Sequence, residues 1–138
     1  MAEALILDSE AVNALARPTE RKVLAARASA VLSLAYERRA LVRVPAAVLA
    51  EVCRGDRFDS AINHLLNSPG VAVFELNRTI AQQAGHLLAR LKLSSAHAVD
   101  AFVVATALQF ETAVIATGDP GDIRRLAAPF GRVGILAL

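Results

Sequence analysis

Four carboxylates stand apart from the other acidic residues of this 138-residue sequence. Each follows an apolar run or lies inside an apolar segment: Asp8 after ALIL, Glu51 in VPAAVLAEVC, Asp100 in HAVDAFVV and Asp119 after TAVIATG. Carboxylates packed together repel one another strongly unless a cation neutralises them. Oxygen ligands without a His or Cys cluster suit hard ions such as Mg²⁺ or Mn²⁺. The sequence therefore predicts a metal centre that leaves coordination positions for water and a substrate phosphate.

Asp100 is the least easily explained of the four in structural terms. The segment 94–110 predicts a helix that is apolar on nearly all sides, and such a helix is buried. No Lys or Arg occurs between Lys92 and Arg124. Burying an unpaired carboxylate costs several kcal/mol, so Asp100 must meet a cation, meet hydrogen-bond donors or stay protonated. His97, one turn earlier, is a candidate base or metal ligand, although a structural histidine is the commoner role.

The other three acids also have purely structural interpretations. Asp8 can cap a helix, Asp119 can be a turn residue in Gly-Asp-Pro-Gly, and Glu51 can pair with Arg54. Asp122 competes with Asp119 for the fourth ligand position. The coincidence favours a metal centre, because four different segments each supply one acid.

Three polar residues are candidates for a supporting role. Ser9 and Thr117 each place a hydroxyl beside a strand-end acid, where it can bond a phosphate oxygen or a water; capping a helix or forming a turn is an equally good role for them. Asn13 follows Ser9 in the same polar turn or helix start and is the third candidate.

Short apolar runs alternate with helical patterns along the chain. Strands are expected at 4–7, 41–44, 71–76, 112–116 and 133–138, and helices at 20–39, 46–53, 58–67, 80–93, 94–110 and 123–127, with a tight loop at 118–121. This alternation is typical of a parallel sheet covered on both faces. We expect an α/β fold, a three-layer α/β/α sandwich with a mostly parallel central sheet, built by residues 1–138 as a single domain. Sites in such sheets form beyond the carboxyl ends of the strands, where the four acids can meet.

The composition indicates a compact globular protein, with 55% hydrophobic and 20% charged residues. No uncharged run approaches the roughly 18 apolar residues of a membrane span, and the first residues lack the basic start and cleavage site of a signal peptide. Cys53 is the one cysteine, which excludes an internal disulfide and fits a reducing compartment. We therefore expect a cytoplasmic protein that makes no membrane contact.

In the order and spacing of these motifs the chain resembles the PIN domain family, and within it the VapC-type toxins of bacterial toxin–antitoxin pairs. The matching residues are Asp8 with Ser9 in LILDS, Glu51 in VLAEVCRG, Asp100 in HAVDAFVVATAL and Asp119 in IATGDPGDI. The chain departs from the family pattern at Ala50, where a hydroxyl residue often precedes the Glu, and at Ile123, where many members have Phe.

The resemblance implies a metal-dependent endoribonuclease in which these four acids form the catalytic site and hold Mg²⁺, with Mn²⁺ as the other candidate ion. It also implies an RNA substrate, a homodimer and a cognate VapB-like antitoxin that wraps the toxin and blocks the acidic pocket. Because an acidic pocket repels RNA, arginines such as Arg54 and Arg17 are expected to bring phosphates in. The helix 20–39 is expected to border a groove for an apolar antitoxin helix.

Two other classes of protein remain in view. A catalytically inactive PIN-like module that binds RNA or protein is the main alternative, and retention of all four acids argues against it. A receiver domain needs a Lys at a later strand end, and neither Lys22 nor Lys92 is so placed. An aspartyl phosphatase needs a second Asp where this chain has Glu10.

Overall fold

The central sheet has five strands in the order β3-β2-β1-β4-β5, in a computed structural model that describes residues 3–138. The strands are β1 (Glu3–Leu7), β2 (Leu41–Pro45), β3 (Val71–Phe74), β4 (Thr112–Thr117) and β5 (Val133–Ala137). Every neighbouring pair is parallel, so the mostly parallel sheet expected from the sequence is parallel throughout.

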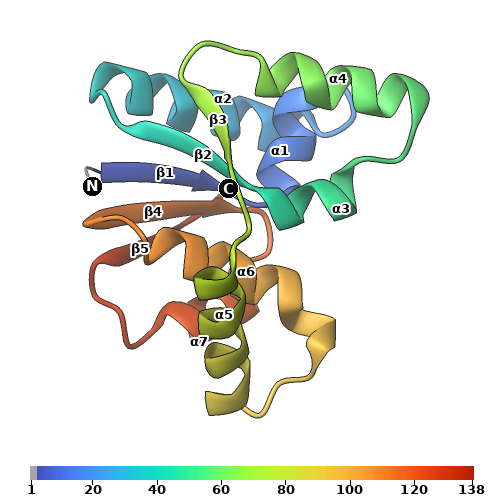
Figure 1. Cartoon of the computed structure of the whole chain (residues 1–138). Helices are drawn as coiled ribbons and strands as arrows, with labels where there is room; N and C mark the ends of the chain where they lie inside the picture. Colours follow the sequence, from blue (N-terminus) through green and yellow to red (C-terminus); the bar gives the residue numbers. More distant parts are fainter. Residues whose placement is uncertain (1–2) are drawn as a thin grey trace.

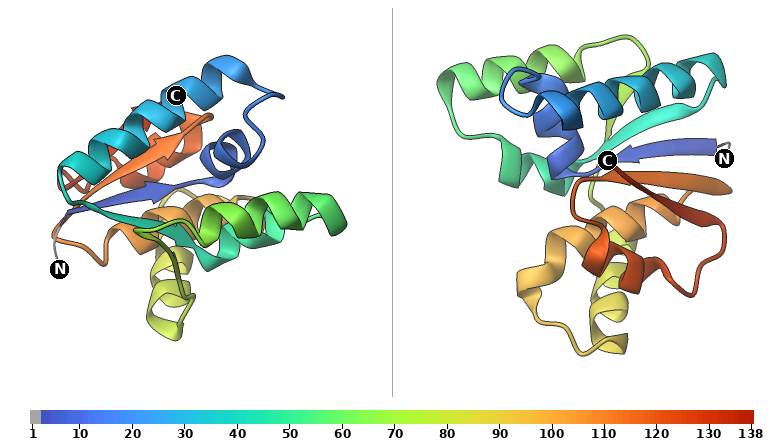
Figure 2. Two further views of the ribbon diagram at one scale, coloured as in Figure 1. Left: turned by 90° about the horizontal axis from the view of Figure 1, so that it is seen from above. Right: turned by 180° about the vertical axis from the view of Figure 1, so that it is seen from behind.

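Helices cover both faces of this sheet. They are α1 (Ser9–Ala16), α2 (Lys22–Glu37), α3 (Leu49–Val52), α4 (Asp56–Leu66), α5 (Arg78–Arg90), α6 (Ala98–Ala107) and α7 (Pro120–Ala127), with short 3₁₀ turns η1 (Ala46–Val48) and η2 (Ser95–His97). Helices α1, α2 and α4 lie on one side of the sheet, and α5, α6 and α7 on the other (Figure 1). The views in Figure 2 show the same two layers, which confirms the predicted α/β/α sandwich. None of the helices within residues 3–138 combines the length and the hydropathy of a membrane span.

Two predicted helices and a predicted loop differ most from the structure, and the strand expected at 71–76 ends at Phe74. The helix expected at 46–53 is divided into η1 and α3, and the helix expected at 94–110 is divided into η2 and α6, which ends at Ala107. The tight loop expected at 118–121 is wrong in its second half, because α7 already begins at Pro120. Proline is favoured at the first position of a helix, where its missing N–H would have no intrahelical partner.

In the core, the neighbouring strands β1 and β4 both pack against α6. The side chains of Ile6, Leu7 and Ile115 are essentially inaccessible to solvent. Helix α6 is built mostly of Ala and Val and buries the residues from Val103 to Ala107. Small side chains let it pack closely on the strands. Its first turn consequently lies against the carboxyl end of the sheet.

The strand order reverses between β1 and β4, because β2 and β3 extend the sheet on one side of β1 and β4 and β5 on the other. At this point the backbone N–H of Asp8 donates to the carbonyl of Ala116 at 3.3 Å. In parallel α/β sheets, this reversal leaves a crevice beyond the strand ends, which is where ligands bind.

Candidate metal centre

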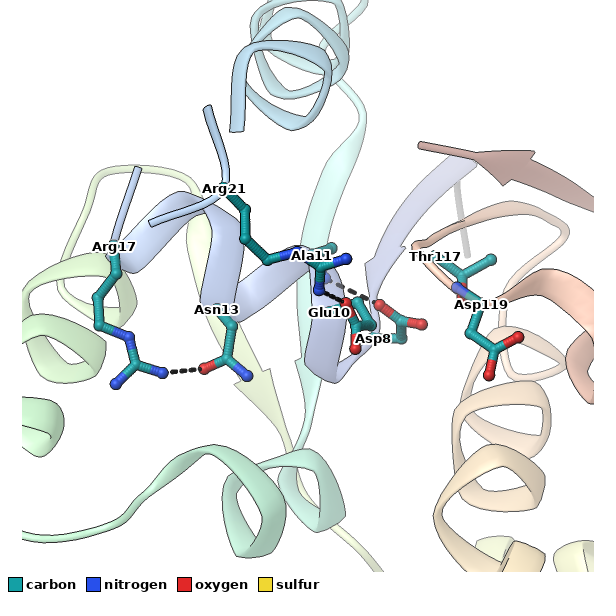
Figure 3. A network of polar contacts seen from close by, with 8 residues as sticks. All are labelled: Asp8, Glu10, Ala11, Asn13, Arg17, Arg21, Thr117 and Asp119. Carbon is teal, nitrogen blue, oxygen red and sulfur yellow. Dashed lines mark hydrogen bonds and ion pairs between the residues drawn. The ribbon is translucent and has the colours of Figure 1, made fainter. Parts of the chain in front are cut away.

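The four acids singled out by the sequence line one hollow of about 340 Å³. Asp8 follows β1, Glu51 lies on α3, Asp100 is in the first turn of α6, and Asp119 follows β4. Ser9 and Asn13 line the same hollow, as do Glu10, Val99 and Val103. Thr117 is not in the lining but lies fully buried beneath it at the end of β4. Figure 3 shows Asp8, Thr117 and Asp119 gathered where β1 and β4 end.

Asp8 is the most buried of the four acids, with 6% of its surface exposed. Its carboxylate accepts a hydrogen bond from the backbone N–H of Ala11 at 2.9 Å and so caps α1, as its structural interpretation requires. Burial raises the pKa of Asp8 from its usual 3.8 to about 6, although hydrogen bonds from Thr117 and Ala11 lower it and the charge of Glu10 raises it. The Thr117 oxygen itself accepts from the backbone N–H of Asp119 at 3.0 Å, which leaves the hydroxyl proton for Asp8.

Asp100 is half-buried rather than buried, because only the later turns of α6 are fully enclosed. The expectation of a fully buried carboxylate at this position is wrong. Desolvation nevertheless raises the pKa of Asp100, and the negative charges of Asp122, Glu51 and Asp119 raise it further, against a smaller lowering by His97. Three carboxylates from two other segments, α3 and the start of α7, therefore disfavour the ionised form of Asp100.

Glu51 is tied to the hollow by Ser9 and not by Arg54. The Ser9 hydroxyl donates a short hydrogen bond to Glu51 Oε1, which joins the start of α1 to α3. The guanidinium of Arg54 instead donates to the carbonyls of Ala50 and Cys53 at 3.1 and 3.3 Å. Glu51 thus has a neutral donor in place of the alternative pair with Arg54, and its charge stays available to the hollow.

Glu10 is a fifth acid of the hollow that the sequence analysis did not select. Its carboxylate is paired with Arg21, which reaches toward it from the segment after α1 (Figure 3). Gly118 makes room for it, since a Cβ at that position would lie 2.8 Å from Glu10 Cβ. The first-turn position of Glu10 beside Asp8 was a usable signal. The pairing with Arg21 was not predictable from spacing, because the two residues lie on separate segments.

Arg17 and Asn13 bond each other at the outer end of α1. Arg17 Nη2 donates to Asn13 Oδ1 at 2.9 Å, and the guanidinium lies 4.7 Å from the ring centre of Phe58. Arg17 Nε is also 3.5 Å from Glu20 Oε2. Asn13 therefore connects an arginine to the lining of the hollow.

Asp122 does not line the hollow. It is the second residue after Pro120 in α7, where its two carboxylate oxygens contact His97 Nδ1 at 3.1 Å and Arg125 Nη1 at 3.2 Å. Asp119, on the other hand, lines the hollow directly. The geometry thus favours Asp119 over Asp122 as the fourth acid of this hollow.

The lining fits a hard divalent cation by the chemistry of its donors. The side-chain atoms of the lining that could bind a metal are all oxygens, apart from the amide nitrogen of Asn13, and the lining contains no cysteine or histidine. Ionised Asp8 and Asp100 are both disfavoured without a counter-charge, as their raised pKa values indicate. A bound cation would reverse that preference. Asp8, Glu51, Asp100 and Asp119 are the residues that would hold it.

The sequence matches a known family, and the fold is similar to that of a solved structure. The family model described as PIN domain matches residues 5–129. No curated protein matches the chain. Among solved structures, the chain resembles VapBC2 from Rickettsia felis, crystallised with a DNA fragment from its promoter, with a TM-score of 0.67 and 11% identity over 98% of each chain. At that identity the likeness concerns the fold alone. The family match spans all four acids of the hollow, and the chain belongs to the PIN domain family.

Proposed function

We propose that this protein is a Mg²⁺- or Mn²⁺-dependent endoribonuclease and the toxin of a toxin–antitoxin pair. The observation that carries the proposal is the convergence of Asp8, Glu51, Asp100 and Asp119, from four different elements, on one hollow at the strand reversal. In PIN-type chemistry, a bound divalent ion supplies a Lewis acid that activates water and neutralises charge on the phosphate oxygens. Phosphodiester hydrolysis is the reaction class that such a set of acids serves best.

The protein side chains divide the remaining work. Thr117 and the backbone of Ala11 direct donors at Asp8 and hold its carboxylate in place. Ser9 holds Glu51 in the same way. Because these donors are neutral, they orient the acids without cancelling the negative charge that the cation needs.

Arginines at the rim are proposed to bring RNA phosphates to this acidic hollow. Arg21 is the best placed of them. It forms an ion pair with Glu10, which lines the hollow, and more than half of its side chain is exposed. Arg17 adjoins the lining through Asn13. Arg54 is occupied with backbone carbonyls at the end of α3, so its part in RNA binding has less support.

The antitoxin partner is supported by the VapC-type sequence motifs, by the likeness of the fold to VapBC2 and by the surface around α2. A hollow of about 600 Å³ lies between α1, α2 and α4, lined by Leu15, Ala16, Leu32, Arg57, Ser60, Ala61, His64, Leu65 and Ser68. Its apolar residues suit the non-polar face of a helix. We propose this groove for the antitoxin helix, and we retain the homodimer as part of the same proposal.

RNA cleavage by the purified, antitoxin-free protein tests the enzymatic proposal. Structured tRNA and rRNA segments should be cut internally with Mg²⁺ or Mn²⁺, and EDTA should stop the reaction. Asp100→Asn should remove most activity at nearly unchanged side-chain volume. Glu37→Gln is the matched control. Glu37 is the last residue of α2 and precedes the amino end of β2, whereas the acidic hollow lies at the carboxyl ends of the strands.

The result also separates the nuclease from an inactive binding module. Cleavage that survives EDTA or Asp100→Asn would refute the metal-dependent mechanism. Tight RNA binding without cleavage of any tested RNA would favour the module.

A further inference from the structure

A second group of metal-ligating side chains lies beside the acidic hollow. His97 at the end of η2, Asp100 in the first turn of α6 and Asp122 in the first turn of α7 each offer one ligand atom, and these atoms lie within 4.8 Å of one another. In residues 3–138 they form the one such group of three His, Cys, Asp or Glu side chains. Asp100 belongs to both the hollow and this group, whereas His97 and Asp122 do not line the hollow.

The group brings two carboxylates together, since ligand atoms of Asp100 and Asp122 lie within 4.8 Å of each other. Two carboxylates so close together disfavour joint ionisation unless a cation lies between them.

The existing contacts of Asp122 are of a kind that a metal ion can displace. His97 and Asp122 are about one-third exposed, and Arg125 is more than half exposed. Exposed ion pairs of this kind contribute little to stability. The contact between His97 Nδ1 and Asp122 is therefore weak enough for a metal ion to replace it.

The donor atoms decide which ions this position prefers. Mg²⁺ favours oxygen ligands and retains its waters, whereas Mn²⁺ and, more strongly, Zn²⁺ accept an imidazole nitrogen beside carboxylates. We propose that His97, Asp100 and Asp122 form a second cation position, next to the acidic hollow and sharing Asp100 with it, that binds nitrogen-accepting divalent ions such as Mn²⁺ in preference to Mg²⁺. This position does not depend on the proposed RNA cleavage.

Pulsed EPR of the Mn²⁺-loaded protein, in the absence of RNA, tests the position directly. The wild-type protein should show the ¹⁴N coupling of an imidazole bound to Mn²⁺. His97→Gln should abolish that coupling. His86→Gln is the matched control and should retain it, because His86 is exposed on α5 and belongs to no metal-ligating group. No nitrogen coupling in the wild type, or coupling that persists in His97→Gln, would overturn the proposal.

Binding affinities provide the second arm of the test. Asp122→Asn should weaken the Mn²⁺ affinity of the His97-containing position by about tenfold or more, while Mg²⁺ affinity, measured by calorimetry, changes little. Equal losses for both ions would place Asp122 in the acidic hollow instead and overturn the second position. Because neither measurement uses RNA, failure of the nuclease proposal would leave this result unaffected, and the reverse also holds.

Discussion

Replacing Asp8 by Asn should stabilise the metal-free protein at neutral pH. Burial raises the pKa of Asp8 from 3.8 to about 6, and this difference corresponds to about 3 kcal/mol of penalty on the ionised folded state. Asparagine is neutral, occupies nearly the same volume and caps a helix as well as aspartate does. We expect Asp8→Asn to raise the free energy of unfolding by about 2 to 3 kcal/mol at pH 8 in the presence of EDTA.

The sign of the pH dependence follows from proton uptake. Between about pH 4 and pH 6 the folded protein holds the Asp8 proton more tightly than the unfolded chain does. The stability contributed by protonated Asp8 is therefore complete below this window and is lost as the pH rises through about 6. The difference between Asp8→Asn and the wild type should be close to zero near pH 4 and complete near pH 8.

Urea unfolding followed by circular dichroism measures this difference at a series of pH values. Adding Mg²⁺ should narrow the gap at pH 8, because the ion binds the wild-type site better than the substituted one and stabilises the folded state to which it binds. Thr117 and Ala11 bond the side chain in the wild type, so an unchanged unfolding slope is needed to show that the substitution leaves the fold intact. A stability difference that is the same at pH 4 and pH 8 would refute the argument.

Two further predictions concern local structure. Gly118→Ala should lower the free energy of unfolding by about 1 to 3 kcal/mol, because the added methyl group would lie 2.8 Å from Glu10 Cβ. Gly85→Ala is the control: it has open space around it and should be neutral or stabilising by up to about 1 kcal/mol. Equal effects of the two substitutions in urea unfolding would contradict the close approach of Gly118 to Glu10. Asn77→Ala should cost about 1 kcal/mol by the same measurement, since the Asn77 side chain accepts from the backbone N–H of Ile80 at 2.9 Å and caps α5; no loss of stability would mean that water caps the helix equally well.

The fold was predictable because local patterns specify its elements. Apolar runs of four to six residues between helical segments indicate buried parallel strands, and the helix expected at 80–93 corresponds to α5. The end of the helix expected at 94–110 was not predictable in the same way. Arg132 donates to the carbonyls of Leu108 and Phe110 and so satisfies the backbone beyond α6. That contact joins segments more than twenty residues apart, and no local pattern announces it.

In the candidate site, too, local patterns were predictable and contacts between distant segments were not. Asp8, Glu51, Asp100 and Asp119 could be selected because each lies in an apolar context that a solvated acid avoids. The contacts around these acids could not be predicted, because they join residues distant in sequence: Ser9 to Glu51, Arg21 to Glu10, and His97 to Asp122. Residue type and spacing therefore predict which groups take part in a site of this kind. They do not predict which neighbours bond those groups.

The distribution of donors around the acids explains how the site can keep its negative charge in a stable protein. Arginines or a histidine pair with Glu3, Glu10, Glu20 and Asp122, and none of these ion pairs within residues 3–138 involves the four inner acids. Two of the inner acids receive neutral donors instead: Asp8 from Thr117 and Glu51 from Ser9. An arginine bonded to Asp8 would lower its pKa and stabilise the fold, but it would also occupy the charge that a divalent ion requires. For the proposed metal centre, the raised pKa of Asp8 is the thermodynamic consequence of leaving its buried charge free for a cation, at a cost in stability.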